Sequence, residues 1–316
     1  MKADKLFYIF ELTKRRLLGL KSAPGKTTLA RVVLSLIREL IALTRSKYIR
    51  VILDAGGCKG SMIARLKNIP GVIYLIRAKR YSNLVEDWNR AVEETGYIKY
   101  EDPTDPKKER TIKIAETETK VPGLKEEERT IIVLDEKAQK AKDRFYPLYT
   151  NDPVGSGLPL VIEYRRRQNH ELAYRVMTHD LNLDALPKSY PINGKSNKPR
   201  FMSKAVHLIA WVKALTFNLI SDFKEELDEK YHTMTIGTIV RKFIARSAIL
   251  KIRRNELVVV FDYFKEQEAL RDYCHKINMR EARIPWLQNR ILKFEFKTCP
   301  ELLEQAKMRK KIMLRL

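Results

Sequence analysis

Apolar residues alternate between helical and strand spacing along the first quarter of the chain. An apolar and aromatic run at 6–12 predicts a strand, and a stripe at helical spacing over 29–43 predicts a helix with one buried face. Runs at 49–54 and 72–77 predict buried strands, with a helix at 61–68 between them. A helix between two buried strands favours parallel strands in an α/β fold.

The pattern changes after residue 80. A helix at 83–94 is followed by a polar, Thr-rich segment in which 111–114 alternates between polar and apolar residues. An apolar run at 130–134 and a further strand at 144–151 complete the segment, and Pro and Gly residues separate these elements. The pattern predicts an antiparallel β-rich insertion with an exposed, charged face.

Helices dominate the prediction beyond residue 151. A Gly-Ser-Gly turn at 155–157 leads into a helix that contains Tyr164 and Glu171. The segment 205–223 is apolar nearly all round but is interrupted by polar residues, which indicates a buried core helix rather than a membrane span. A helix is predicted at 236–246.

The C-terminal pattern is a hairpin followed by a basic end. Residues 249–261 are mostly apolar around a polar tip and predict a β-hairpin. The segment 305–316 is basic and indicates a helix that faces solvent or nucleic acid. Together these changes divide the chain into four parts, namely a partial core at 1–80, the β-rich insertion at 81–150, a return to the core at 151–230 and a basic region at 231–316.

Charge narrows the classes of partner. The 316 residues include 62 Lys and Arg against 39 Asp and Glu, a net charge of +23. A protein this basic is typical of those that bind a polyanion, most often nucleic acid, although RNA and anionic membrane surfaces remain open. The 44% hydrophobic content is enough for a sizeable core. No apolar run approaches the roughly 18–20 residues needed to span a bilayer, so we expect no membrane insertion.

Cysteine and histidine give no sign of a zinc site. Three Cys and five His are scattered without metal-ligand spacing, and an odd, sparse Cys count fits a reducing compartment. We therefore expect a cytoplasmic protein, associated with the nucleoid if its polyanion is DNA. A fragment at 21–28 is similar to a phosphate-binding loop, but Leu20 stands where that loop needs Gly. A loop and helix cap is the better interpretation.

Two acidic residues, Asp54 and Glu171, are candidates for a functional site. Asp54 ends a predicted strand, the place where open α/β sheets carry their sites, although it could also cap the following turn. On a helix, Tyr164, Arg167, Glu171 and Arg175 are spaced to share one face. Glu171 could form only i,i+4 ion pairs there, which are common and weak.

The spacing of these residues resembles a known signature. Tyr164, two residues, Arg167, three residues and Glu171 match the start of the Y-(2)-R-(3)-E-(6)-K signature of DDE-type insertion-sequence transposases, whose catalytic domain is RNase H-like. The segments 51–56 and 72–79 are similar to the second-aspartate region of that family, and 149–151 to the strand end before its glutamate helix. The resemblance covers roughly residues 25–260, with 116 residues between the two acids, which allows the β-rich insertion usual in this group.

The resemblance implies a fold, a site and a set of partners. The fold would be α/β, with a partial RNase H-like core of mixed sheet and helices, the insertion, and a mostly helical C-terminal part. Asp54 and Glu171 would be catalytic ligands of two Mg²⁺ (or Mn²⁺) ions. DNA phosphates would be bound by the side chains of Tyr164, Arg165, Arg166, Arg167 and Arg175. The partners would be terminal inverted repeats and target DNA, with a homodimer in the synaptic complex.

Two departures from the family pattern limit the resemblance. The last signature position holds Thr178 instead of Lys, which removes a candidate phosphate contact. The family's first aspartate lies on a strand that precedes two further strands and a helix, whereas only one strand and one helix are predicted before Asp54. Asp4 precedes an apolar run and is not that aspartate. We therefore expect a chain without the amino-terminal portion of a full-length transposase, and weak or absent catalysis.

Other functions remain open from the sequence. A non-catalytic, basic DNA-binding relic of a transposase is the main alternative, and an RNA-binding factor rests on charge alone. The recognised DNA ends, the target site and the transposition pathway leave no trace in the sequence.

Overall fold

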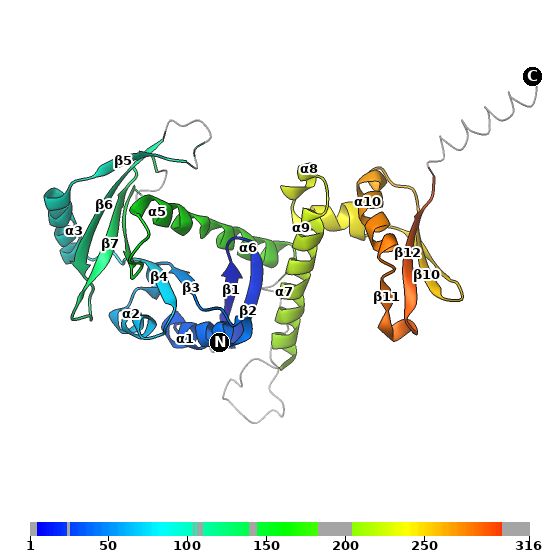
Figure 1. Ribbon diagram of the computed structural model, residues 1–316, viewed down its shortest axis with the longest axis horizontal. Coiled ribbons are helices and arrows are strands. Elements are labelled where there is room, and N and C mark those ends of the chain that lie inside the picture. Colours follow the sequence, from blue (N-terminus) through cyan, green and yellow to red (C-terminus); the bar gives the residue numbers. More distant parts are fainter. Residues whose placement is uncertain are drawn as a thin grey trace, which may run out of the picture. The chain divides into compact units, whose positions relative to one another are not determined.

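The chain folds into two compact units. The computed structural model describes residues 5–23, 26–103, 105, 110–138, 144–182 and 204–298. One unit comprises Met1–Arg175 and Ala185–Val212, and the other comprises Val176–Asp184 and Lys213–Leu316. The division falls within two helices, whereas the sequence suggested a change at residue 231. Figure 1 shows the elements of each unit.

A mixed six-stranded sheet forms the first unit. The two strands next to Asp54 pair in parallel, and the rest of the sheet is antiparallel. In spatial order the strands are β3 (Ile49–Leu53), β4 (Val72–Arg77), β8 (Phe145–Thr150), β7 (Glu127–Leu134), β6 (Thr111–Lys120) and β5 (Ile98–Glu101). The expected α/β fold with a mixed sheet is confirmed.

Helices cover both faces of this sheet (Figure 1). On one face lie α1 (Leu29–Thr44), α2 (Gly60–Lys67) and α3 (Ser82–Thr95), whose apolar residues share one core that includes the fully buried Trp88 of α3. On the other face, α5 (Gly157–Arg166) packs on side chains from β4, β6, β7 and β8. Each helix buries its stripe because burial of apolar surface is the main favourable term in folding.

The predicted insertion belongs to the same sheet. Its strands β5 to β8 are antiparallel, as expected, but they extend the core sheet from β4 instead of forming a separate layer. The expected exposed, charged face is wrong for β7, where residues from both faces are buried. The reason is tertiary, because α3 packs against β6 on one side and α5 packs against β6 and β7 on the other.

Two strands, and not one, precede α1. β1 (Lys5–Glu11) and β2 (Arg16–Ala23) form an antiparallel hairpin. The second strand was missed because only Leu17 and Leu20 of β2 are buried, a spacing of three that does not show strand alternation. β2 includes residues 21–23 of the fragment that was interpreted as a loop and helix cap, and Pro24 and Gly25 lie outside the described residues.

The second unit combines helices with a small sheet. Its helical part contains α8 (Glu229–His232), α9 (Ile236–Ile239) and a π-helical turn at Val240–Ile244. The predicted hairpin is confirmed as β9 (Ala248–Ile252) and β10 (Glu256–Phe261). The sheet order β11-β12-β10-β9 is completed by β11 (Arg283–Ile284) and β12 (Arg290–Phe296), and α10 (Gln267–Met279) packs along β12. The predicted basic end at 305–316 lies outside the described residues.

The long apolar helix is not buried all round. α7 (Lys204–Glu225) buries Ala210 and Ala214 on one face, but Leu208, Leu215 and Leu219 are each more than half exposed. The expectation of a buried core helix is therefore wrong for one face of α7. Within the described residues, no helix is both long and apolar enough to cross a bilayer.

Candidate functional site

Asp54 stands at the carboxyl end of β3, as the sequence predicted. Its Oδ1 accepts the backbone N–H of Gly56 at 3.0 Å and so caps the short turn Ala55–Gly57. The capping role and a role at a site are compatible, because the residue is exposed and one bond uses only part of the acceptor capacity of a carboxylate. Parallel pairing of β3 with β4 places this acid where α/β sheets carry their sites.

The helix that carries the Tyr-Arg-Glu spacing is interrupted at its arginine. α5 ends at Arg166, and α6 (Gln168–His179) begins one residue after Arg167. Arg167 N–H donates to Tyr164 O, and His170 N–H donates to Arg167 O, so the chain tightens to i,i−3 bonds at this point. The prediction of one continuous helix face is therefore wrong. The i,i+4 ion pair from Arg167 Nη2 to Glu171 Oε1 is nevertheless present at 2.9 Å.

The two predicted acids lie around the same pair of side chains. The negative charges of Asp54 and Glu171 both act on the Arg167 guanidinium. Burial lowers its pKa, but Tyr164 and the two carboxylates outweigh burial, so that the pKa is raised overall. For His170, burial and the charge of Arg167 lower the pKa, and Glu171 and Asp54 only partly oppose them. The fold thus places two acids that are separated by 116 residues in the sequence so that both act on the same two side chains.

Two buried donors at this place have no acceptor. The Tyr164 hydroxyl and Arg167 Nε are buried and have no partner at full hydrogen-bond geometry within the described part of the chain, although Arg167 and Arg77 lie close enough to act on the hydroxyl. Buried polar atoms are nearly always paired, so an unpaired one needs an explanation. A phosphate oxygen commonly accepts hydrogen bonds from adjacent donors of this kind, one of which belongs to a guanidinium.

Arg77, at the end of β4, belongs to the same cluster. Burial raises the pKa of the Tyr164 hydroxyl, while the positive charges of Arg167 and Arg77 partly oppose that rise. The Arg77 guanidinium lies 4.9 Å from the ring centre of Tyr146, which packs 6.0 Å from the Tyr164 ring. Arg77 was not among the site residues predicted from the sequence. Its place as a basic residue at the end of the second parallel strand could have indicated it.

The other three predicted arginines differ in environment. Arg165 Nη1 and Nη2 pair with the buried carboxylates of Asp102 and Asp135 at 2.5 and 2.8 Å. Arg165 is thus partly buried and, together with Arg110, balances the charge of these two acids, so its guanidinium is less available for a ligand than the sequence suggested. Arg166 and Arg175 are exposed.

The N-terminal hairpin packs against the first turns of α6. The Tyr8 ring of β1 stacks on His170 at 4.7 Å and on Tyr174 at 5.8 Å, measured between ring centres. Burial raises the pKa of Tyr8, and the nearby Tyr174 and Glu171 raise it further, so its hydroxyl stays protonated at neutral pH. This stacking orients the turn of α6 that carries Glu171.

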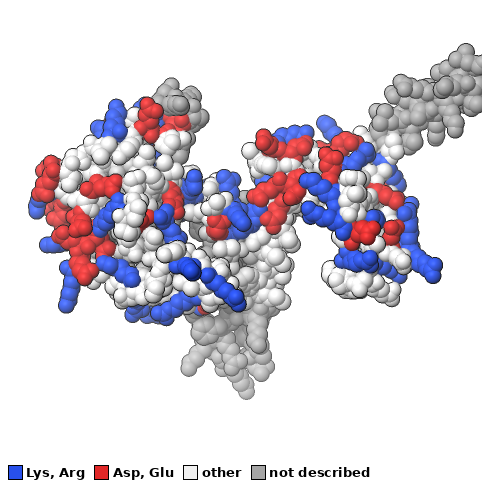
Figure 2. Space-filling model, in the orientation of Figure 1, with Lys and Arg blue, Asp and Glu red and all other residues white. Residues whose placement is uncertain are grey.

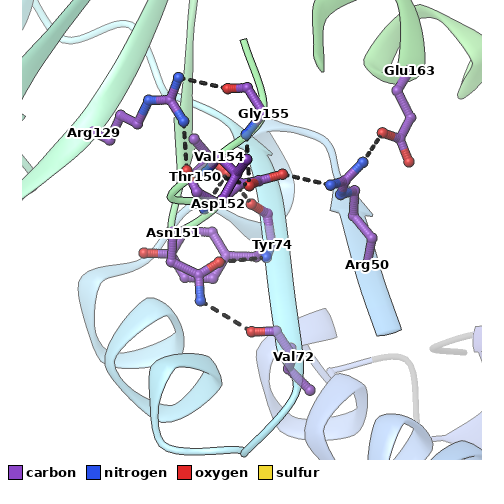
Figure 3. A network of polar contacts seen from close by, with 10 residues as sticks. All are labelled: Arg50, Val72, Tyr74, Arg129, Thr150, Asn151, Asp152, Val154, Gly155 and Glu163. Atoms are coloured by element: carbon purple, nitrogen blue, oxygen red, sulfur yellow. Dashed lines mark hydrogen bonds and ion pairs between the residues drawn. The ribbon is translucent and has the colours of Figure 1, made fainter. Parts of the chain in front are cut away.

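The connection from β8 to α5 is fixed by a polar network (Figure 3). The Asn151 side chain continues the sheet beyond β8, because its Oδ1 accepts Tyr74 N–H at 2.8 Å and its Nδ2 donates to Val72 O at 3.0 Å. Asp152 Oδ1 accepts the backbone N–H groups of Val154 and Gly155 at 3.0 and 2.9 Å. The Asn151 side chain thus makes the backbone bonds that a further strand residue would make, and the Asp152 side chain stabilises the turn that follows.

Arg50 of β3 ties this loop to the helix. Its guanidinium pairs with Asp152 at 2.5 Å and also with Glu163 of α5. On the other side, Arg129 of β7 donates to the backbone oxygens of Asp152 and Gly155. The network joins β3, β7 and α5, and it therefore sets the position of Tyr164 relative to Asp54.

The side chains that could hold a metal ion are Asp54 and Glu171. Mg²⁺ and Mn²⁺ prefer oxygen ligands, and both carboxylates are exposed. Within the residues that the structure describes, no group of three or more His, Cys, Asp or Glu side chains is placed to hold a metal. Two carboxylates suit one hard cation completed by water, whereas a two-ion site needs more ligands than this part of the chain supplies.

Comparison with known proteins leaves the family open. No protein-family model matches the chain, and no curated protein matches it.

Proposed function

We propose that the protein is a DNA-binding polynucleotidyl transferase of the DDE transposase type, with Asp54 and Glu171 as its acids. The observation that carries the proposal is that Asp54 and Glu171, from distant parts of the chain, both act electrostatically on Arg167 and His170, and that Glu171 pairs with Arg167 at 2.9 Å. With Mg²⁺ or Mn²⁺ held between them, the ion would supply Lewis-acid activation of a phosphodiester.

The basic residues of the site support DNA as the substrate. Arg167 Nε and the Tyr164 hydroxyl are buried donors without a well-aligned acceptor, and Arg77 adds a second guanidinium. In these roles they would bind and orient one backbone phosphate beside the acids, while the exposed Arg166 and Arg175 would add sequence-independent attraction. The partners would be element ends and target DNA, with a dimer needed to hold two ends.

The order of elements before Asp54 also supports the proposal. The hairpin β1–β2 and helix α1 precede β3, which is the arrangement of two strands and a helix that the resemblance implies between the first and second aspartates. Thr178 in place of Lys is a departure that stays unexplained.

A second function is favoured by the acids themselves. Glu171 is engaged by Arg167, and the described residues offer no third ligand for a metal. A chain that holds DNA without cutting it would keep the phosphate-binding donors and lose the metal chemistry.

The binding test compares Arg77→Ala and Arg167→Ala with Arg90→Ala. Arg90 is an exposed arginine on α3, away from the candidate site in sequence and fold, so it controls for the loss of one charge. Removing one charge-assisted phosphate contact should weaken binding about tenfold, or roughly 1.4 kcal/mol. Fluorescence anisotropy with duplex DNA measures it. Equal affinities of all three variants, or a preference for RNA, would contradict the proposed site.

The cleavage test separates the two functions. DNA that carries the element's ends is incubated with the protein and Mg²⁺ or Mn²⁺, and nicked strands are counted. Cleavage that is lost in Asp54→Asn and Glu171→Gln, but kept in the exposed control Glu86→Gln, supports the transferase. Tight DNA binding with no metal-dependent cleavage supports the non-catalytic alternative, and cleavage that survives both substitutions overturns the acid assignment.

A further inference from the structure

The sheet of the second unit ends on an unusually exposed strand. All five residues of β9 (Ala248–Ile252) are exposed, and the large side chains of Ile249, Leu250 and Ile252 are 46%, 65% and 70% exposed. Among the described residues no strand pairs with the outer side of β9, which is the last strand of its sheet. A bare apolar edge of this kind is a template for pairing with another strand.

The opposite edge of this sheet is protected. β11 pairs with the start of β12, and further along the Asn278 side chain bonds both the N–H and the C=O of Phe294, at 2.8 and 2.9 Å. The side chain of one residue thus satisfies the backbone that a neighbouring strand would otherwise bond. Within the described part of the unit, β9 has no comparable cover.

The hairpin bonds show which groups of β9 point outward. Arg253 and Glu256 exchange both backbone hydrogen bonds, so they form a hydrogen-bonded pair. Such pairs alternate along an antiparallel ladder, and the register of β9 with β10 then makes 249 and 251 bond inward. The N–H and C=O groups of Ala248, Leu250 and Ile252 therefore point to the free edge.

The same three residues continue an apolar face. They share their side of the sheet with Leu257, Val259 and Phe261 of β10, which lie opposite Leu292, Phe294 and Phe296 of β12. The Phe261 ring stacks on Phe296 at 5.3 Å and on Phe294 at 6.0 Å, which places the rings on one face. The buried Val258 and Val260 belong to the other face of β10.

We propose that β9 pairs with β9 of a second copy of this chain, antiparallel, about a two-fold axis at Leu250. This register uses all three outward residues of each copy, because Leu250 faces Leu250 of the other copy and Ala248 faces Ile252. A shift of the axis to 249 or 251 leaves one outward residue of each copy unpaired. The interface is isologous and closes both edges at once.

Charge disfavours the alternative register with its axis at residue 251. With the axis at Leu250, each Lys251 faces Ile249 of the other copy, so its aliphatic stem covers an apolar side chain. With the axis at residue 251, the two Lys251 side chains would face each other directly, and like charges in opposite positions destabilise a ladder. The result is an eight-stranded sheet across two copies. The inference stands apart from the proposed function, because it rests only on the second unit.

Cysteine cross-linking tests the register in the full-length chain. Cys58 and Cys274 are buried, and Cys299 is replaced by Ser to leave a quiet background. In an antiparallel hydrogen-bonded pair the Cα atoms are about 5.5 Å apart, within disulfide range, so Leu250→Cys should form a disulfide-linked dimer on mild oxidation. Ile249→Cys is the matched control, because the two copies of residue 249 would be about 8 Å apart, beyond that range.

The oligomeric state provides the second readout. The wild-type chain should sediment as a dimer, and Leu250→Lys, which sets two charges face to face, should raise the dimer dissociation constant at least tenfold. Leu43→Lys, at an 80% exposed site on α1, should leave it unchanged. A wild-type monomer at all concentrations, or cross-linking of Lys251→Cys in preference to Leu250→Cys, overturns the proposal. A monomer that dimerises only after removal of residues 299–316 also overturns it, and assigns the edge to that segment.

Discussion

Asp152 shows how one side chain positions a site that it does not touch. Its carboxylate is buried, accepts two backbone N–H groups and pairs with Arg50. Burial raises its pKa, but these bonds and the charges of Arg50 and Arg129 lower it by more. The folded state therefore prefers the ionised form, which links the shape of the loop before α5 to pH.

Replacing Asp152 with Asn should destabilise the protein by about 3 kcal/mol, since it leaves Arg50 without one of its buried partners. A lowered folded pKa contributes stability above the unfolded pKa of about 3.9, and that stability is lost as pH falls through the folded pKa. Urea unfolding should thus show a wild-type advantage at pH 7 that shrinks below pH 4. A difference that is constant with pH would contradict this assignment.

At the scale of elements, the hairpin β1–β2 and helix α6 depend on each other. The hairpin shares no strand pairing with the six-stranded sheet among the described residues, so its position depends on side-chain packing. Tyr8 contributes to that packing through His170 and Tyr174, and both strands also contact α1. The turn of α6 that carries Glu171 is therefore stabilised by β1, which is far away in the sequence.

Tyr8→Ala should lower the free energy of unfolding by roughly 2 kcal/mol, less than the 3–5 typical of fully buried aromatic residues because Tyr8 is only half-buried. Hydrogen exchange should accelerate in β1 and β2 more than in β4 or β8. Tyr8→Phe keeps the ring and is the control, with little change expected. Equal exchange in both variants would show that the ring does not hold the hairpin.

At the scale of the whole molecule, charge is the dominant property. Figure 2 shows Lys and Arg side chains over both units, while Asp and Glu gather over α3 in the first unit and over α8 and α10 in the second. The net charge of +23 would thus act on DNA mainly through surfaces other than these acidic ones.

DNA affinity should therefore depend steeply on salt. If six or more phosphates are neutralised, affinity falls at least about 1,000-fold between 50 and 200 mM salt. The double variant Arg77→Ala/Arg167→Ala should reduce the slope of log affinity against log salt by about 2. Titrations at several salt concentrations measure both. A slope near zero would exclude phosphate contacts as the main source of affinity.

Much of the fold could be predicted because local periodicity reports local burial. The spacing of apolar residues located α1, α2, α3, β3, β4 and the hairpin β9–β10. It missed β2, where two buried leucines do not make an alternating pattern, and it joined α5 and α6, because the i,i−3 bonds at Arg167 leave no mark in the sequence pattern. Short-range patterns of apolar residues do not indicate a weakly buried strand or a local break in a helix.

The sequence by itself determined the element types, the basic character and the pairing of Tyr164, Arg167 and Glu171 as candidates. Only the tertiary structure decided which charges are available. It paired Arg165 with two buried acids, placed Arg77 beside Tyr164, exposed one face of α7 and left β9 at an open edge. The physical reason is that burial and charge pairing depend on contacts between distant segments, and these exist only once the chain has folded.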